Sequence, residues 1–143
     1  MSNYYPPLGF HFRVEFANQS DEYQFQSVSG LSVNLETEEI NEGGENRFSH
    51  RLPVKTKYPN LILKRGLLVH SGLIDWCRKA MEGFDFEPTD LIIKLLNEKN
   101  EPLMSWNVVH AWPVKWSVGE FNAEESQIVI ESLELTYSYF KNL

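Results

Sequence analysis

Cysteine is nearly absent from this sequence of 143 residues, and this and other shortages exclude several protein classes. The single Cys77 can form neither an intramolecular disulfide nor a multi-cysteine zinc site. Lys and Arg number 13 against 20 Asp and Glu, a net charge of −7, so the basic excess of proteins that coat nucleic acids is missing. No apolar run approaches the ~20 residues that cross a bilayer. We therefore expect no specific nucleic-acid partner and no direct membrane anchor.

The first residues, Met1–Pro7, also lack the basic and apolar regions of a signal peptide, so we expect synthesis without one. What is present suffices for a packed core, because 42% of the residues are hydrophobic and 13% are aromatic. The length leaves little room for two separately cored units. We therefore expect residues 1–143 to form a single domain.

Alternating apolar and polar residues predict that most of the chain forms β-strands. Phe10–Phe16 alternates in this way, and after a polar turn Tyr23–Gln26 resumes the pattern as a hairpin partner. Gly30 interrupts this second strand and predicts a bulge or a close backbone approach. Leu91–Leu96 is apolar on both faces except at Lys94, which is typical of a centrally placed strand.

One helix is predicted over residues 71–83. Ser71 is a suitable N-cap and Gly83 a suitable C-cap. The apolar residues that share one face of this helix are Leu73, Trp76, Cys77, Ala80 and Met81. Because a helix of about a dozen residues is marginal alone, this face should dock on the sheet.

A long alternating stretch, Met104–Val118, predicts an extended strand. Trp106, Trp112 and Trp116 have the same parity in it, and their shared face is either core or a sugar-stacking platform. Pro113 cannot donate to a hydrogen-bond ladder, so the strand should bend or lie at an edge there.

The C-terminal segment Gln127–Phe140 changes the parity of its apolar residues. Either a bulge near Glu131 and Ser132 or a strand that changes partner sheets would account for this change. The patterns together predict seven or eight strands and one helix. The expected fold class is mainly β with one α-helix, an antiparallel β-barrel or sandwich of two sheets flanked by the helix.

Residues 36–57 differ in character and predict a long protruding hairpin or loop. Five carboxylates and no cation lie between Glu36 and Glu45, Gly43 and Gly44 lie in the middle, and the exit is basic. The arms are too polar to form core, but opposite charges could pair across them, at roughly 0.2–1 kcal/mol for each pair. An exposed arm offers unpaired backbone, so we expect it to pair with another chain.

No catalytic or metal-binding constellation stands out. The 4 histidines are dispersed singly, and Cys77 on the apolar helical face is expected to be buried and inert. Calcium binding by Glu36–Glu45 is conceivable, although the spacing of an EF-hand loop is absent. A small hydrolase that uses clustered carboxylates has little support, because no nucleophile–base pair can be proposed from spacing. We expect no enzyme, cofactor or metal.

An ordered set of segments carries a family resemblance. The segments are Phe25–Leu31, Glu42–Arg47, Leu52–Pro53, Leu63–Gly66, Trp76, Trp106, Ala111–Trp116, Phe121–Ala123 and Ile130–Leu135. In this order and at these spacings they resemble the inner tail-tube proteins of contractile-tailed phages and phage-like contractile injection systems. The similarity runs from about Phe10 to the C-terminus.

The resemblance implies a β-barrel of two sheets that assembles as a hexameric ring, with rings stacked into a tube around a hollow lumen for cargo. The hairpin would reach the neighbouring subunit or ring. The hairpin residues that the resemblance assigns to this contact are Ile40, Glu42, Gly43, Gly44, Glu45, Asn46, Arg47, Phe48, Leu52 and Pro53. The implied partners are further copies of the chain, adjacent rings, spike or hub and baseplate proteins, and a surrounding sheath.

The resemblance also implies that the protein is made in the bacterial cytoplasm and becomes part of an injection particle or virion tail. No member of this type is an enzyme. The aromatic end Tyr137–Phe140 departs from the more polar or Gly-containing C-terminus expected of a tube protein. The choice between a repeating tube subunit and a specialised tube-initiator ring therefore stays open, and a carbohydrate-binding β-sandwich is the alternative function.

Overall fold

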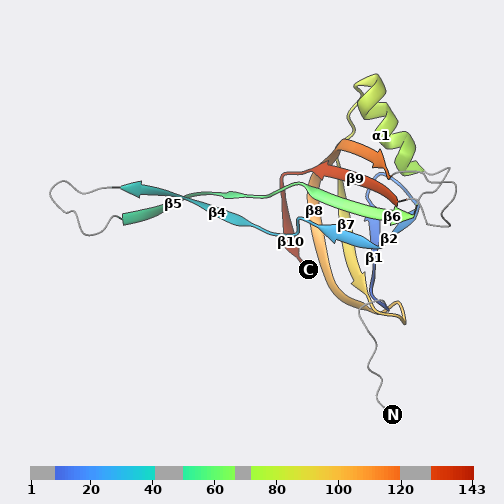
Figure 1. Ribbon diagram of the computed structural model, residues 1–143, viewed down its shortest axis with the longest axis horizontal. Helices are drawn as coiled ribbons and strands as arrows, with labels where there is room; N and C mark the ends of the chain where they lie inside the picture. Colours follow the sequence, from blue (N-terminus) through green and yellow to red (C-terminus); the bar gives the residue numbers. More distant parts are fainter. Residues whose placement is uncertain (1–8, 41–49, 67–71, 120–129) are drawn as a thin grey trace, which may run out of the picture.

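The computed structural model describes residues 9–40, 50–66, 72–119 and 130–143, which form a β-sandwich with a long projecting hairpin (Figure 1). This part of the chain contains ten strands and one helix, and every paired strand runs antiparallel to its neighbour. The predicted fold class, mainly β with a single helix and two sheets, is confirmed in the form of a sandwich; the barrel is not closed.

One continuous path of hydrogen-bonded strands makes both layers. Its order is β2 (Glu22–Phe25), β1 (His11–Phe16), β7 (Thr89–Leu96), β8 (Pro102–Val118), β9 (Ile130–Thr136), β6 (Leu61–Gly66) and β3 (Ser27–Ser29). The short β10 (Tyr139–Asn142) adds to β8 beside this path. A separate two-stranded sheet consists of β4 (Asn34–Ile40) and β5 (His50–Lys57).

The long strand β8 joins the two layers because it changes partner along its length. Its first part pairs with β7 and its second part pairs with β9. His110 takes a left-handed conformation (φ 60°) near the end of the part that pairs with β7, and its N–H donates to Asp90 Oδ1 at 3.0 Å. The predicted irregularity at Pro113 is confirmed, because the register with β9 shifts between Pro113 and Lys115.

The predicted common face of three tryptophans is wrong. Trp106 and Trp116 lie opposite buried residues of β7 and β9, and directly opposed residues share a face, so both point toward the core side. Trp112 instead packs its ring on Phe86, with 5.3 Å between centroids. The two irregularities in β8, at His110 and near Pro113, interrupt the simple alternation that the sequence suggests.

The C-terminal change of parity is caused by a charged residue at an inward position. The register between β6 and β9 is unbroken, so the bulge considered near Glu131 and Ser132 is absent. Glu131 points inward together with Leu133 and Leu135. Because Glu131 is charged, the sequence pattern does not identify it as an inward-facing position. The chain does change partner, because it leaves β9 after Thr136 and returns as β10 on the other part of β8. This change comes after Leu133 and Leu135 and therefore does not cause the change of parity.

The core lies between the layers and beneath α1 (Gly72–Gly83). The helix buries Leu73, Trp76, Cys77 and Ala80, as the spacing predicts, whereas Met81 is exposed. Trp76 packs edge-on against Phe16, at 5.4 Å between ring centroids, and its Nε1 donates to the Glu87 carbonyl at 2.9 Å. These contacts fix the helix on the sheets.

The predicted cap at Gly83 needs correction. Gly83 is the last helical residue, and Phe84 takes the left-handed conformation after it (φ 55°). The proposed N-cap Ser71 lies outside the described residues. Among the residues described, α1 is the single helix, and its 12 residues are too few to cross a membrane.

Gly30 makes the close backbone approach that the sequence predicts. It has φ 95°, and a Cβ atom built on it would lie 2.2 Å from the carbonyl oxygen of Asn60. Only glycine fits there without displacing the backbone. The crossing lies where the chain leaves the sandwich for the β4–β5 hairpin, so it fixes the base of that hairpin.

Candidate assembly surface

The β4–β5 hairpin is the candidate functional site. It extends away from the sandwich, to the left in Figure 1, with no layer of the protein beneath it. The two strands pair from Asn34 opposite Lys57 to Ile40 opposite His50. Neither strand contains a buried residue. The protruding hairpin that the sequence predicts is therefore present over residues 34–40 and 50–57.

Both outer edges of the hairpin are available for further pairing, because β4 and β5 pair only with each other in the described part of the chain. The register shifts between Glu36 and Thr37, which leaves Val54 without an opposite residue. Pro53 lies next to this bulge, a position in which proline is tolerated on an edge strand. The ribbon thus offers unpaired backbone to a second chain.

Cross-strand ion pairs support the ribbon. Lys55 Nζ lies 3.7 Å from Glu36 Oε2, and Lys57 Nζ lies 3.8 Å from Glu36 Oε1. Glu39 lies opposite Arg51, a second place where the acidic strand faces the basic one. The predicted charge pairing between the two arms is confirmed. All the groups around Glu36 are exposed, so each pair contributes at most about 1 kcal/mol and weakens as salt is added.

Apolar side chains occur on both faces of the ribbon and are exposed. They are Val33 just before β4, Leu35 and Ile40 in β4, and Leu52 and Val54 in β5. Leu52 is opposite Glu38 and Ile40 is opposite His50, so Leu52 and Ile40 share a face; Leu35 lies on the other. A two-stranded hairpin without support is at best marginally stable in water. This apolar surface is therefore typical of a segment that becomes covered by a partner.

Of the residues predicted for this contact, the structure places Ile40, Leu52 and Pro53 on the hairpin. The remaining predicted residues, Glu42, Gly43, Gly44, Glu45, Asn46, Arg47 and Phe48, lie outside the described residues. The exposed Val33, Leu35 and Val54 were not among the predicted contacts. The alternation of Leu31, Val33 and Leu35 was the sequence signal that could have found two of them.

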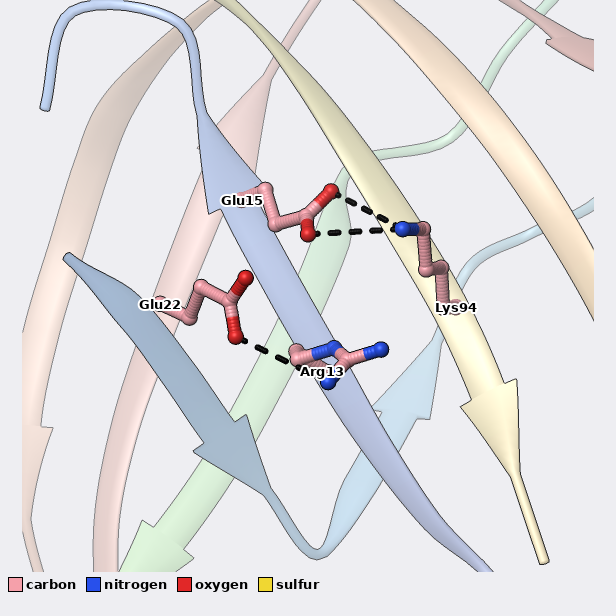
Figure 2. A network of polar contacts seen from close by, with 4 residues as sticks. All are labelled: Arg13, Glu15, Glu22 and Lys94. Carbon is pink, nitrogen blue, oxygen red and sulfur yellow. Dashed lines mark hydrogen bonds and ion pairs between the residues drawn. The ribbon is translucent and has the colours of Figure 1, made fainter. Parts of the chain in front are cut away.

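The outer face of β2, β1 and β7 contrasts with the hairpin, because it is polar and its charges are paired (Figure 2). Arg13 Nη1 lies 3.6 Å from Glu22 Oε2, and Lys94 Nζ lies 3.2 Å from Glu15 Oε2. The polar Lys94 in the otherwise apolar segment Leu91–Leu96 of β7 is thus explained by its cross-strand partner. A face of this kind is suited to water rather than to a hydrophobic partner.

A buried ion pair lies inside the sandwich. Arg65 Nε is 2.8 Å from Glu131 Oε2, and both side chains are only 3% exposed. Trp116 Nε1 donates to the other carboxylate oxygen at 2.6 Å. The Arg65 guanidinium lies over the rings of Tyr23 and Phe25, at 5.5 and 5.3 Å from their centroids. Both carboxylate oxygens are engaged and shielded, so this pair ties β6 to β9 and is not placed for catalysis.

The single cysteine is not an activated nucleophile. Burial, and secondarily the Glu131 carboxylate, raises the pKa of the Cys77 thiol to about 12, so the thiol stays protonated. No group of three or more His, Cys, Asp or Glu side chains that could hold a metal occurs in the ranges described. Of the hairpin carboxylates described, Glu36 pairs with Lys55 and Lys57, and Glu39 lies opposite Arg51.

Comparisons with known proteins agree with this geometry. The sequence matches the family described as T4-like virus tail tube protein gp19 over residues 8–141. A chain of the anti-feeding prophage baseplate, solved by cryo-EM with six-fold symmetrisation, is 32% identical with a TM-score of 0.81. That alignment covers 100% of this chain and 97% of the other.

A second similar structure comes from the sheath–tube complex of an extracellular contractile injection system, PVC, in its extended state. It is 26% identical with a TM-score of 0.79, over 99% of this chain and 93% of that one. Hcp1 from Flavobacterium johnsoniae shares the fold at 14% identity and a TM-score of 0.55, over 92% of this chain and 94% of that one. A search of curated protein sequences found no match. The protein belongs to the T4-like tail tube protein family, alongside the tube proteins of phage-like contractile injection systems.

Proposed function

We propose that this chain, as one tail-tube-like domain of residues 1–143, forms hexameric rings of the inner tube of a contractile injection system or phage tail. Rings stack end to end around a hollow lumen through which cargo passes. The observation that carries the proposal is the β4–β5 hairpin, which projects from the sandwich and has exposed apolar side chains on both faces. The residues proposed for the contact include Ile40, Leu52 and Pro53 and continue through residues 42–48.

The proposed partners follow from the relatives. The similar baseplate chain was solved in a six-fold symmetrised assembly, which supports the hexamer, and the PVC relative occurs in a sheath–tube complex. We infer the same kinds of neighbour here: further copies in the ring, adjacent rings, a spike or hub with baseplate proteins, and a sheath around the tube. The protein is made in the bacterial cytoplasm and works in the assembled particle.

The role is mechanical and requires no catalysis. A ring of six open-edged subunits pairs its edge strands by closure, which a monomer with this hairpin cannot do. A rigid tube built of such rings is driven outward when the sheath contracts. The buried Arg65–Glu131 pair and the protonated Cys77 thiol are consistent with this role, because they contribute to the packed interior and are sealed from substrate.

Deletion of Glu38–Phe48 tests the hairpin's role. We expect the protomer to keep its sandwich, because no buried residue is removed from the described part of that segment, and we expect ring stacking to be lost. Circular dichroism and thermal unfolding monitor the fold, and negative-stain electron microscopy monitors assembly. The control is Lys94→Gln, which breaks the ion pair with Glu15 on the polar face and should leave stacking intact. Intact tubes from the deletion variant would refute the assignment.

A further inference from the structure

The base of the hairpin is held by aromatic residues from the end of the chain. Tyr58, which follows β5, packs edge-on against Tyr137 and Phe140, with centroid distances of 5.9 and 5.3 Å. The ring centroids of Tyr137 and Phe140 are 6.3 Å apart. These three residues, called the root cluster below, connect the returning arm of the hairpin to the C-terminal segment.

The outgoing arm of the hairpin, which follows Gly30, is also held by the root cluster. Tyr137 Oη donates to the Gly30 carbonyl at 3.5 Å, a weak hydrogen bond to the residue from which the hairpin departs. Gly30 in turn passes so close to the backbone of Asn60 that a Cβ atom built on it would meet the Asn60 carbonyl oxygen. Asn60 Nδ2 donates to Glu134 Oε2 of β9 at 2.9 Å. At the base of the hairpin, both arms therefore contact each other and the C-terminal strands.

The root cluster is itself fixed to the sandwich. Tyr137 and Phe140 are partly buried and pack against the hydrophobic core. The Ser138 N–H donates to the Val109 carbonyl at 2.9 Å, and β10 then pairs with β8 from Tyr139 opposite Val109 onward. The C-terminal aromatic rings thus belong to the rigid body, while Tyr58 belongs to the arm.

Because the hairpin is long, a small rotation at its base causes a large displacement of its far end. The seven residues of β4, at ~3.3 Å each, give an arm of about 23 Å. A rotation of about 10° at the base would move the far end by about 4 Å, whereas a gap of only 0.5–1 Å already forfeits a quarter to a half of a packing contact. A hairpin that docks on a neighbour therefore needs a stiff base.

We propose that Tyr137 and Phe140 are positioning residues that hold the hairpin in the one direction from which it can dock on a neighbouring copy. This inference rests on the proposed function, because it takes the hairpin to be the docking arm. It also accounts for the aromatic residues near the C-terminus, because Tyr137 and Phe140 are the residues against which Tyr58 packs.

Distance measurements between spin labels test the proposal directly. The labels are placed at Thr37→Cys on the hairpin and Gln24→Cys on β2, both exposed, in a Cys77→Ala background. An excess of unlabelled protein keeps distances between subunits out of the signal. The test variants are Tyr137→Ala and Phe140→Ala. The matched control is Tyr139→Ala, which removes a neighbouring aromatic residue that is not part of the root cluster.

We expect a narrow distance distribution in the parent and in Tyr139→Ala, and one about twice as wide in the two test variants, because the base then samples more orientations. The concentration at which assemblies appear should rise about tenfold in the test variants. Tyr137→Phe keeps the ring and loses only the weak hydrogen bond to Gly30, so both readouts should stay close to those of the parent. If Phe140→Ala does not fold, Tyr58→Ala removes the arm's side of the same contact without touching the C-terminal strand.

The two readouts separate this proposal from the proposed function. A distribution that stays narrow in the folded test variants would overturn the positioning role. A broadened distribution with unchanged assembly would confirm that role and show instead that the hairpin is not the docking arm. Broadening together with weakened assembly supports both.

Discussion

The sandwich and the hairpin both contain aliphatic side chains, but the sandwich buries them and the hairpin exposes them. In the sandwich, residues such as Leu61, Leu63 and Ile93 are fully buried. In the hairpin, Leu35 is 58% exposed and Leu52 is 47% exposed. The sandwich therefore carries its own stabilisation, whereas the hairpin leaves its apolar surface for a partner to cover.

The charges show the same contrast. The Arg65–Glu131 pair is shielded in the core, where the loss of one partner would leave an uncompensated charge. The contacts of Glu36 with Lys55 and Lys57 lie in water, where each contributes little. Mutations in the first region should change folding, and mutations in the second should change association.

The largest effect is expected from Glu131→Ala. It leaves the Arg65 guanidinium buried without its carboxylate and removes the acceptor of the Trp116 hydrogen bond, so the free energy of unfolding should fall by about 3–5 kcal/mol. Urea denaturation of the monomer measures this change. The double variant Arg65→Met/Glu131→Leu is the control and should lose much less. A loss under about 1 kcal/mol in the single variant would contradict the account.

A matched leucine pair compares the two regions directly. Leu63→Ala should destabilise the protomer by about 2–5 kcal/mol, because Leu63 is fully buried. Leu52→Ala should change the free energy of unfolding by less than about 0.5 kcal/mol. For assembly, the order of the two variants is reversed. Leu52→Ala should raise the protein concentration at which light scattering first detects assemblies. Equal destabilisation of the protomer by both variants would remove the distinction between the regions.

A smaller effect is expected from Glu36→Gln. It weakens both cross-strand ion pairs of the hairpin, so assembly should weaken by no more than about 1 kcal/mol. Because exposed pairs are screened, the difference from the parent should shrink between 0.05 and 0.5 M salt, as followed by sedimentation. A difference that does not depend on salt would argue against an electrostatic cause.

The smallest effect at neutral pH concerns the ionisation of Cys77 and Tyr137. Burial raises the pKa of Cys77 to about 12 and that of Tyr137 to about 12, so the unfolded chain releases these protons at lower pH than the folded chain does. Stability should therefore be unaffected below about pH 9 and should fall as pH rises from 9 to 12. Cys77→Ala should make this fall shallower in urea titrations at each pH. An unchanged slope would contradict the contribution of the thiol.

Periodicity alone predicts much of the fold. The β1–β2 pairing, the buried face of α1 and the close approach at Gly30 all follow from local patterns. The errors arise where a charge or an irregular backbone breaks a pattern. Glu131 hides the inward parity of β9, and the left-handed His110 together with the bulge near Pro113 rotates the tryptophans of β8 onto different sides.

The candidate site was predicted less completely than the fold. The charge pattern and the central glycines indicate a projecting hairpin, and Ile40, Leu52 and Pro53 lie on it. The aromatic contacts at its base join Tyr58 to Phe140, which are far apart in the sequence, so no local pattern reveals them. Contacts between residues so far apart in the sequence can be identified only from the three-dimensional arrangement of the strands.

Negative-stain electron microscopy of the purified protein across a concentration series tests the central claim most directly. The account predicts six-fold rings; rings that stack into tubes identify a repeating tube subunit, and rings that remain single identify a tube initiator. Particles that stay monomeric at every concentration, both alone and with isolated baseplates added as a template, would contradict the claim that this hairpin is an assembly arm.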